Sequence, residues 1–206
     1  AVIGSSTAAG EGASSSSRGW VSLLASALED RVAGSFSSRN LSVGGYTTSN
    51  LVPGSSSSGS IDDALDLEPN LVIVALAGSN DLSNGVSTET FLDRLGAIRD
   101  AGVDAGIPVF FVSTAPKDLS DDEQQALADW TDEMRDAFGS CWTPDDASYA
   151  PCFIDIFDAL ANSSLGIADE YGSGDGIHLN DAGHARIFEI AEAIVEPYVC
   201  SMTACR

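Results

Sequence analysis

Two short stretches of this sequence carry the groups that nucleophilic hydrolysis uses: a hydroxyl, an imidazole and a carboxylate. Gly4-Ser5-Ser6 lies close to the start of the chain, and Asp175 stands three residues before His178 near its end. A serine hydroxyl is a poor nucleophile until a neighbouring imidazole takes its proton. A carboxylate on the other ring nitrogen orients the imidazole and stabilises the imidazolium that forms. The two stretches make a hydrolytic site only if the fold brings them together.

Each of these stretches also has an ordinary structural explanation. Ser6 lies in a run rich in serine and glycine, where serines form turns or face solvent. An Asp-x-x-His spacing occurs by chance, and the run 78–81, Gly-Ser-Asn-Asp, is typical of a strand end at which Asp81 caps the next turn. The second histidine, His184, falls inside a predicted helix and is expected to pack or cap there. A shared location in the fold would distinguish function from these alternatives.

The spacing of the apolar residues alternates between the periods of strands and helices. Continuous apolar runs at 71–77 and 108–113 are typical of parallel strands that are covered on both faces. Ser120 and Glu123 have the spacing of a capping box at the start of one helix, and Pro197 should end the last helix. The expected strands are residues 1–4, 36–43, 71–77, 108–113 and 153–156, and the expected helices are residues 20–32, 61–67, 86–105, 120–138 and 182–195.

Strands that alternate with helices of this length predict a three-layer α/β/α sandwich around a five-stranded parallel sheet. The serine- and glycine-rich stretch 54–60 is short enough for a surface loop, so we expect a single domain spanning residues 1–206. In such sheets ligands bind outside the carboxyl ends of the strands. Polar, glycine-rich runs stand at these ends: 4–10, 40–48 and 78–81 each follow a predicted strand, and 175–180 precedes the last helix.

In this order, the four runs resemble the sequence blocks of the SGNH (GDSL) hydrolase family over nearly the whole chain. The family's Gly-Asp-Ser block is similar to Gly4-Ser5-Ser6, its Gly-x-Asn-Asp block to residues 78–81, and its Asp-x-x-His block to Asp175 and His178. The resemblance implies the flavodoxin-like fold of that family. It also implies that Ser6 is the nucleophile, His178 the general base and Asp175 the residue that orients it.

The family's second block contributes a glycine, which is best matched by Gly45, with its neighbour Gly44 as the alternative. The resemblance then implies an oxyanion hole made by the backbone N–H groups of Ser6 and Gly45 and the side-chain amide of Asn80. Tyr46 comes directly after the oxyanion glycine. It is expected either to line the substrate pocket or to be a packed turn aromatic.

The first block departs from the family at Ser5, where the name-giving aspartate stands. That aspartate is not a triad member, so the change bears on the hydrogen bonds that shape the nucleophile turn. The resemblance implies a serine esterase that cleaves carboxylic esters through an acyl-enzyme. No long apolar lid segment is visible, which favours short acyl or O-acetyl groups. The alternatives are a lipase or thioesterase for longer chains, and a non-catalytic carbohydrate-binding module that kept the fold.

The overall charge of the chain disfavours some classes of binding partner. The chain has 31 acidic and 9 basic residues, a formal net charge of −22, and Lys117 is its only lysine. Such a surface repels nucleic acids and anionic lipid, so we expect a small-molecule or carbohydrate ester as the partner and no nucleic acid. No apolar run approaches the ~20 residues of a membrane span. No signal peptide is visible at the start, as would also be the case for a processed chain.

The sequence lacks the motifs of several other enzymes. There is no G-x-S-x-G elbow, no dinucleotide fingerprint, no P-loop and no pair of histidines with metal spacing. The proposed chemistry needs neither a cofactor nor a metal.

Four cysteines form two local pairs whose spacing does not match a zinc site. Of the three pairings, Cys141–Cys152 with Cys200–Cys205 closes the shortest loops, and a 12-residue loop of this kind stabilises by about 3 kcal/mol in the chain-entropy model. Free buried thiols are the alternative. Disulfides would indicate an oxidising compartment, so we expect a secreted or periplasmic protein.

Overall fold

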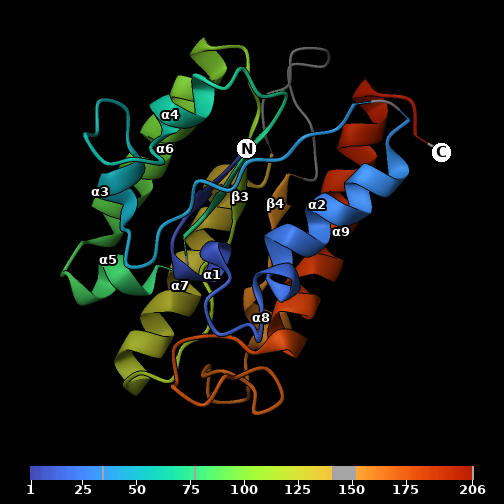
Figure 1. Ribbon diagram of the computed structural model, residues 1–206. Helices are drawn as coiled ribbons and strands as arrows, with labels where there is room; N and C mark the ends of the chain where they lie inside the picture. The colour runs from blue at the N-terminus through green and yellow to red at the C-terminus, as the bar shows by residue number, and fades with distance from the viewer. Residues whose placement is uncertain (34, 77, 141–151, 206) are drawn as a thin grey trace.

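The computed structural model describes residues 1–33, 35–76, 78–140 and 152–205. Its centre is a parallel sheet in which the strands are arranged in chain order: β1 (Val2–Gly4), β2 (Val72–Ala75), β3 (Val109–Val112) and β4 (Phe153–Ile154). Every residue of these strands is buried. Helices cover both faces of the sheet, so the predicted α/β architecture is confirmed (Figure 1).

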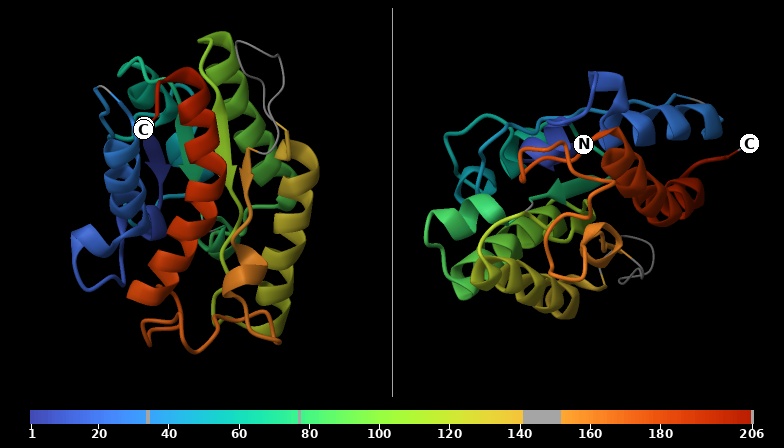
Figure 2. Two further views of the ribbon diagram at one scale, coloured as in Figure 1. Left: turned by 90° about the vertical axis from the view of Figure 1, so that its right-hand side faces the viewer. Right: turned by 90° about the horizontal axis from the view of Figure 1, so that it is seen from below.

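Alternate residues of each strand enter separate cores on the two faces. Ile73 and Ala75 of β2 pack with α2 (Trp20–Arg31) and α9 (Asp181–Met202), which lie side by side (Figure 2). Val72 and Val74 pack on the opposite face. This double burial explains why the strand sequences are continuously apolar. The opposite face is covered by α3 (Thr48–Leu51), α4 (Ile61–Leu65), α6 (Thr88–Asp104) and α7 (Asp121–Phe138).

Short helices occupy the carboxyl edge of the sheet. Single-turn helices come after β1, β2 and β4, which places residues from distant parts of the sequence at the same edge. In Figure 1 this edge lies in the lower half of the molecule, above the orange loop that precedes α9. The short elements are α1 (Ser6–Ala9), the 3₁₀ turn η1 (Ser16–Arg18), α5 (Ser79–Ser83) and α8 (Phe157–Leu160).

The prediction of a strand over residues 36–43 is wrong, and the described sheet has four strands instead of five. The segment does run parallel to the free edge of β1, with one bridge between Val2 and Asn40 and a hydrogen bond from the Val43 N–H to the Gly4 carbonyl. The Asn40 side chain, however, accepts from the Ser42 N–H and donates to the carbonyl of Ala8. The segment makes three backbone hydrogen bonds with β1 but only one bridge, so it does not extend into a strand of the sheet.

The prediction that Pro197 ends the last helix is also wrong, because Pro197 lies inside α9. Beyond it, Tyr198 and Val199 are buried, and the Tyr198 ring lies 5.0 Å from that of Phe110 in β3. The burial of these side chains outweighs the missing backbone hydrogen bond. At 22 residues α9 is the longest helix described, and none of the described helices is apolar enough over sufficient length to cross a bilayer.

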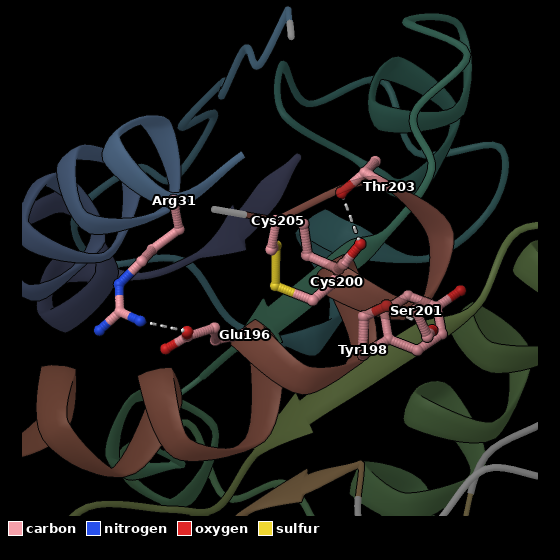
Figure 3. Close-up of a disulfide and its surroundings, with 8 residues drawn as sticks. Arg31, Glu196, Tyr198, Cys200, Ser201, Thr203 and Cys205 are labelled. Atoms are coloured by element: carbon pink, nitrogen blue, oxygen red, sulfur yellow. Dashed lines mark hydrogen bonds and ion pairs between the residues drawn. A yellow bond between two sulfur atoms is a disulfide. The ribbon is translucent and has the colours of Figure 1, made fainter. Parts of the chain in front are cut away.

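The end of α9 is fastened to the end of α2. Figure 3 shows the disulfide between Cys200 and Cys205, whose Cα atoms lie 5.3 Å apart, and the ion pair between Arg31 and Glu196 at 3.0 Å. The backbone of Cys205 also forms an isolated antiparallel β-bridge with Val32. The predicted Cys200–Cys205 pairing is thus confirmed. Cys141 lies outside the described residues, so its pairing with Cys152 stays a prediction.

Candidate active site

Ser6 stands where β1 turns into α1 at the carboxyl edge of the sheet. The turn is tight because Gly4 lies against β2, where a Cβ would overlap the carbonyl oxygen of Ala75. Ser5 continues this contact by donating its backbone N–H to the same oxygen. Ser6 is the first residue of α1 and is 8% exposed. A rigid turn therefore holds the predicted nucleophile close to the surface.

Asp175 and His178 form a hydrogen-bonded pair on the loop before α9. The Oδ2 atom of Asp175 lies 2.6 Å from Nδ1 of His178. Its Oδ1 atom accepts from the backbone N–H groups of His178 and Ile177, at 2.7 and 2.8 Å, and from the Ser173 hydroxyl at 3.0 Å. These bonds, that from the His178 N–H above all, hold the pKa of the Asp175 carboxyl well below its usual range.

These contacts determine the protonation of the pair. An ionised carboxylate only accepts hydrogen bonds, so the Nδ1 atom of His178 must carry the proton that it shares with Asp175. In the neutral imidazole, Nε2 is then free to accept a proton. This is the tautomer that a general base for a serine requires.

The loop that carries His178 packs directly on the segment after α1. A Cβ on Gly12 would overlap the Leu179 carbonyl oxygen and lie 2.8 Å from the Cβ of His178, and the φ of Gly12 is +90°. The fully buried His184 joins the same segment to α9, with Nε2 3.1 Å from the carbonyl oxygen of Glu11. Burial lowers the pKa of His184. These contacts give His184 the packing role that was expected of it.

Glu11 faces the Nε2 atom of His178. Its Oε2 atom lies 3.2 Å from Nε2, and its backbone N–H donates to the Ser6 carbonyl at 3.0 Å. No hydrogen bond joins the side chains of Ser6 and His178, both of which are among the described residues. The structure therefore assembles the Asp175–His178 pair, and a backbone hydrogen bond links Ser6 to Glu11, the residue whose carboxylate contacts Nε2.

Asn80 and the predicted oxyanion glycine lie together. Asn80, in α5, donates its side-chain amide to the carbonyl of Tyr46 at 2.9 Å. Gly45 has a φ of +81°, a left-handed conformation that suits glycine. A Cβ on the neighbouring Gly44 would overlap the Oε1 atom of Glu11. Through Glu11, the glycine turn is therefore adjacent to His178, as the predicted site requires.

Asp81 binds Thr48, which follows the glycine turn, and has a structural role. It is buried, and it accepts from the backbone N–H of Thr48 at 3.0 Å and from the Thr48 hydroxyl at 2.6 Å. Burial raises the pKa of its carboxyl, and these hydrogen bonds and Arg94 oppose the rise. Tyr46 packs against the core on this face, which favours the packed turn aromatic, and its role in substrate binding stays a prediction.

Sequence reasoning missed Glu11. The signal was present, since Glu11 is the only charged residue from position 5 to position 17. Its partner His178, however, lies far along the chain, and no local pattern indicates the contact.

The cavity between α2 and α9 lies away from the candidate site. A cavity of about 290 Å³ lies between α2 and α9 and is lined by Val2, Leu71 and Phe36. It opens at the amino ends of β1 and β2, whereas sheets of this kind bind ligands at the carboxyl ends. The chemical groups described above all lie at the carboxyl edge. Among the described residues, no group of three or more His, Cys, Asp or Glu side chains is arranged to hold a metal ion.

Comparisons with known proteins identify the family and the fold of this chain. The sequence profile of the GDSL-like lipase/acylhydrolase family matches residues 2–186. A search of the curated proteins gives no match. Among solved structures, a member of the lipolytic protein G-D-S-L family from Veillonella parvula is similar, with a TM-score of 0.67, 16% identity, and 95% of this chain and 96% of that chain covered.

Two further structures are similar and are described by their activity. One is the psychrotrophic esterase EstA from Pseudoalteromonas sp., inhibited by monoethylphosphonate, with a TM-score of 0.62, 17% identity and 96% of each chain covered. The other is a two-domain esterase active on acetylated mannans, with a TM-score of 0.58 and 15% identity, which covers 96% of this chain and 49% of that chain. At these identities the likeness concerns the fold.

Proposed function

Because this chain belongs to the GDSL-like lipase/acylhydrolase family, we propose that it is a serine esterase that hydrolyses carboxylic esters through an acyl-enzyme. The observation that carries the proposal is the hydrogen bond of 2.6 Å between Asp175 and His178, on a loop packed against the segment just after Ser6. Asn80 and Gly45 flank the same edge of the sheet. A non-catalytic binding module would have no need of this pair.

In the proposed reaction, Ser6 Oγ attacks the ester carbonyl carbon while His178 Nε2 takes the hydroxyl proton. Asp175 holds the imidazolium that results. The negative charge on the carbonyl oxygen is stabilised by the N–H groups of Ser6 and Gly45 and the amide of Asn80. The tetrahedral intermediate then expels the alcohol, which receives the proton from His178. Water, deprotonated by His178, cleaves the acyl-enzyme and restores Ser6.

Glu11 must leave Nε2 for this reaction to start. A carboxylate only accepts hydrogen bonds, so in the contact of 3.2 Å with Glu11 the Nε2 atom is the donor and already carries the proton that a general base must lack. Glu11 is half exposed, so its side chain can turn outward without unfolding the loop. Substrate that fills the site would displace it.

We propose that the substrates carry short acyl or O-acetyl groups. The cavity between α2 and α9, which could hold a longer chain, lies at the far end of the strands. The similar two-domain esterase acts on acetylated mannans. We also propose a secreted or periplasmic location, which the Cys200–Cys205 disulfide supports.

An acyl-chain series tests this function. We expect kcat/KM for p-nitrophenyl esters to be highest for acetate or butyrate and to fall toward palmitate, and we expect acetate release from at least one acetylated polysaccharide. A maximum at long chains would replace the proposed substrate class with that of a lipase. No hydrolysis of any ester would leave the non-catalytic carbohydrate-binding module.

Replacing Asn80 with alanine should lower kcat by about 10²–10³-fold, the usual effect of losing one oxyanion donor, and change KM little. Steady-state kinetics with p-nitrophenyl acetate measure both. Asn84→Ala is the matched control, because Asn84 is an exposed asparagine that donates to the Asn80 carbonyl at 2.7 Å. An Asn80→Ala variant with the kcat of the wild type would remove Asn80 from the oxyanion hole.

A further inference from the structure

Lys117, the only lysine of the chain, is buried in the segment between β3 and α7, with 1% of its surface exposed. Lysine is rarely buried to this extent unless its ammonium has a partner, because removal of the charge from water is costly. Burial lowers the pKa of Lys117 to about 8, and the nearby Asp175 carboxylate opposes this shift. The esterase reaction described above does not use this group, so its place needs another explanation.

The partner of Lys117 lies inside the proposed catalytic loop. Its Nζ donates to the carbonyl of Ile177, the residue immediately before His178. The next residue, Asp118, donates its backbone N–H to the carbonyl of Gly176 at 2.8 Å. Two consecutive residues therefore hold two consecutive carbonyls of the turn between Asp175 and His178.

The opposite side of the same turn is held by Asp175. The backbone N–H groups of Ile177 and His178 point to its Oδ1 atom. Gly176 has a φ of +74°, and a Cβ there would lie 3.2 Å from that of Asp118. The turn is thus hydrogen-bonded through its amides on one side and through its carbonyls on the other, which leaves it little freedom to rotate.

We propose that Lys117 is a positioning residue of the esterase, which fixes the Ile177 carbonyl and thereby the orientation of the Asp175–His178 pair. The proposal rests on the proposed function. Lys117 acts through the loop and does not touch the substrate. A rate that depends on a well-oriented base is sensitive to small displacements, since about 1 Å can cost 10²-fold.

The charged groups around Lys117 keep the same charge in the pH range in which Lys117 titrates. Asp175 faces it from the loop and remains anionic, since its pKa is lowered. His184, on α9, also interacts with it, and burial lowers the pKa of that imidazole, so it is neutral above pH 7. Of these three groups only Lys117 changes charge near pH 8. Because the neutral amine forms weaker hydrogen bonds than the ammonium, kcat should fall as the pH rises above about 8.

The test is Lys117→Met, which keeps an unbranched side chain only one atom shorter and removes the charge and the donors. Active sites are counted with a phosphonate that labels serine hydrolases, so that kcat refers to sites that react. We expect kcat to fall about 10–100-fold, KM to stay within about twofold, and the fall of kcat above pH 8 to disappear. Arg186→Met, which removes an exposed cation paired with Glu189, should leave all three unchanged.

A Lys117→Met variant with the kcat per active site and the pH profile of the wild type would overturn the proposal. If that variant does not fold, the pH profile of the wild type decides. A wild-type kcat that is constant from pH 7 to 10 would also overturn the proposal. The function itself is tested by Ser6→Ala at the same time. An active Ser6→Ala would reject the serine mechanism, whereas an inactive Ser6→Ala with a normal Lys117→Met would reject only the role of Lys117.

Discussion

Ser6→Ala should lower the kcat of p-nitrophenyl acetate hydrolysis by about 10⁴- to 10⁶-fold, because the variant has no nucleophile and forms no acyl-enzyme. The residual rate would come from substrate binding and the oxyanion donors. The fold should survive, since the change removes one hydroxyl from the first residue of α1 and introduces a good helix former. The melting temperature and circular dichroism of the variant check this.

Ser5→Ala is the matched control for Ser6. Both serines are buried at the same turn, and Ser5 takes part through its backbone N–H, which alanine keeps. We expect Ser5→Ala to retain most of the activity. A phosphonate should add its mass to the wild type and to Ser5→Ala, and leave Ser6→Ala unmodified. Labelling of Ser6→Ala, or loss of activity in Ser5→Ala alone, would place the nucleophile elsewhere.

His178→Gln should lower kcat by an amount similar to Ser6→Ala, because the two residues act as one unit. The pH dependence makes this test specific. In the wild type, kcat/KM should rise from pH 5 to pH 8, since the base must be neutral. Asp175 cannot cause this rise: its pKa is lowered, so the carboxylate stays ionised as the pH falls to 5 and would be neutralised only in stronger acid. The residual activity of His178→Gln should not show the rise.

The second histidine is the control for this experiment. His184→Gln removes a buried ring that contacts the Glu11 carbonyl at 3.1 Å, so it should reduce stability by about 1–3 kcal/mol. The kcat per phosphonate-labelled site should stay close to that of the wild type. A flat wild-type profile between pH 5 and 8, or a rise that persists in His178→Gln, would contradict the role of His178.

The sequence predicted the sheet where its strands are long and apolar. The runs that became β2 and β3 are buried on both faces, and burial of that kind leaves a local pattern. The strand expected at 36–43 failed because the segment pairs with β1 through a single bridge at Asn40. The helix end expected at Pro197 failed because Tyr198 packs on Phe110. Neither contact can be read from local periodicity.

The same distinction holds at the candidate site. The pairing of Asp175 with His178 is expected from their spacing of three residues, which one turn of chain can close. The contacts of Glu11 with His178 and of Lys117 with Ile177 join residues far apart in sequence. Charged residues that meet in this way become visible only when the chain is folded.

Glu11 also bears on the end of the catalytic cycle. Hydrolysis converts a neutral ester into a carboxylate anion, formed beside Glu11 and Asp175 on a protein of net charge −22. Like charges repel most strongly where water is partly excluded. In the proposed reaction we therefore expect the acid to leave readily and Glu11 to return to His178 in its place. Accumulated acetate should inhibit such an enzyme only weakly.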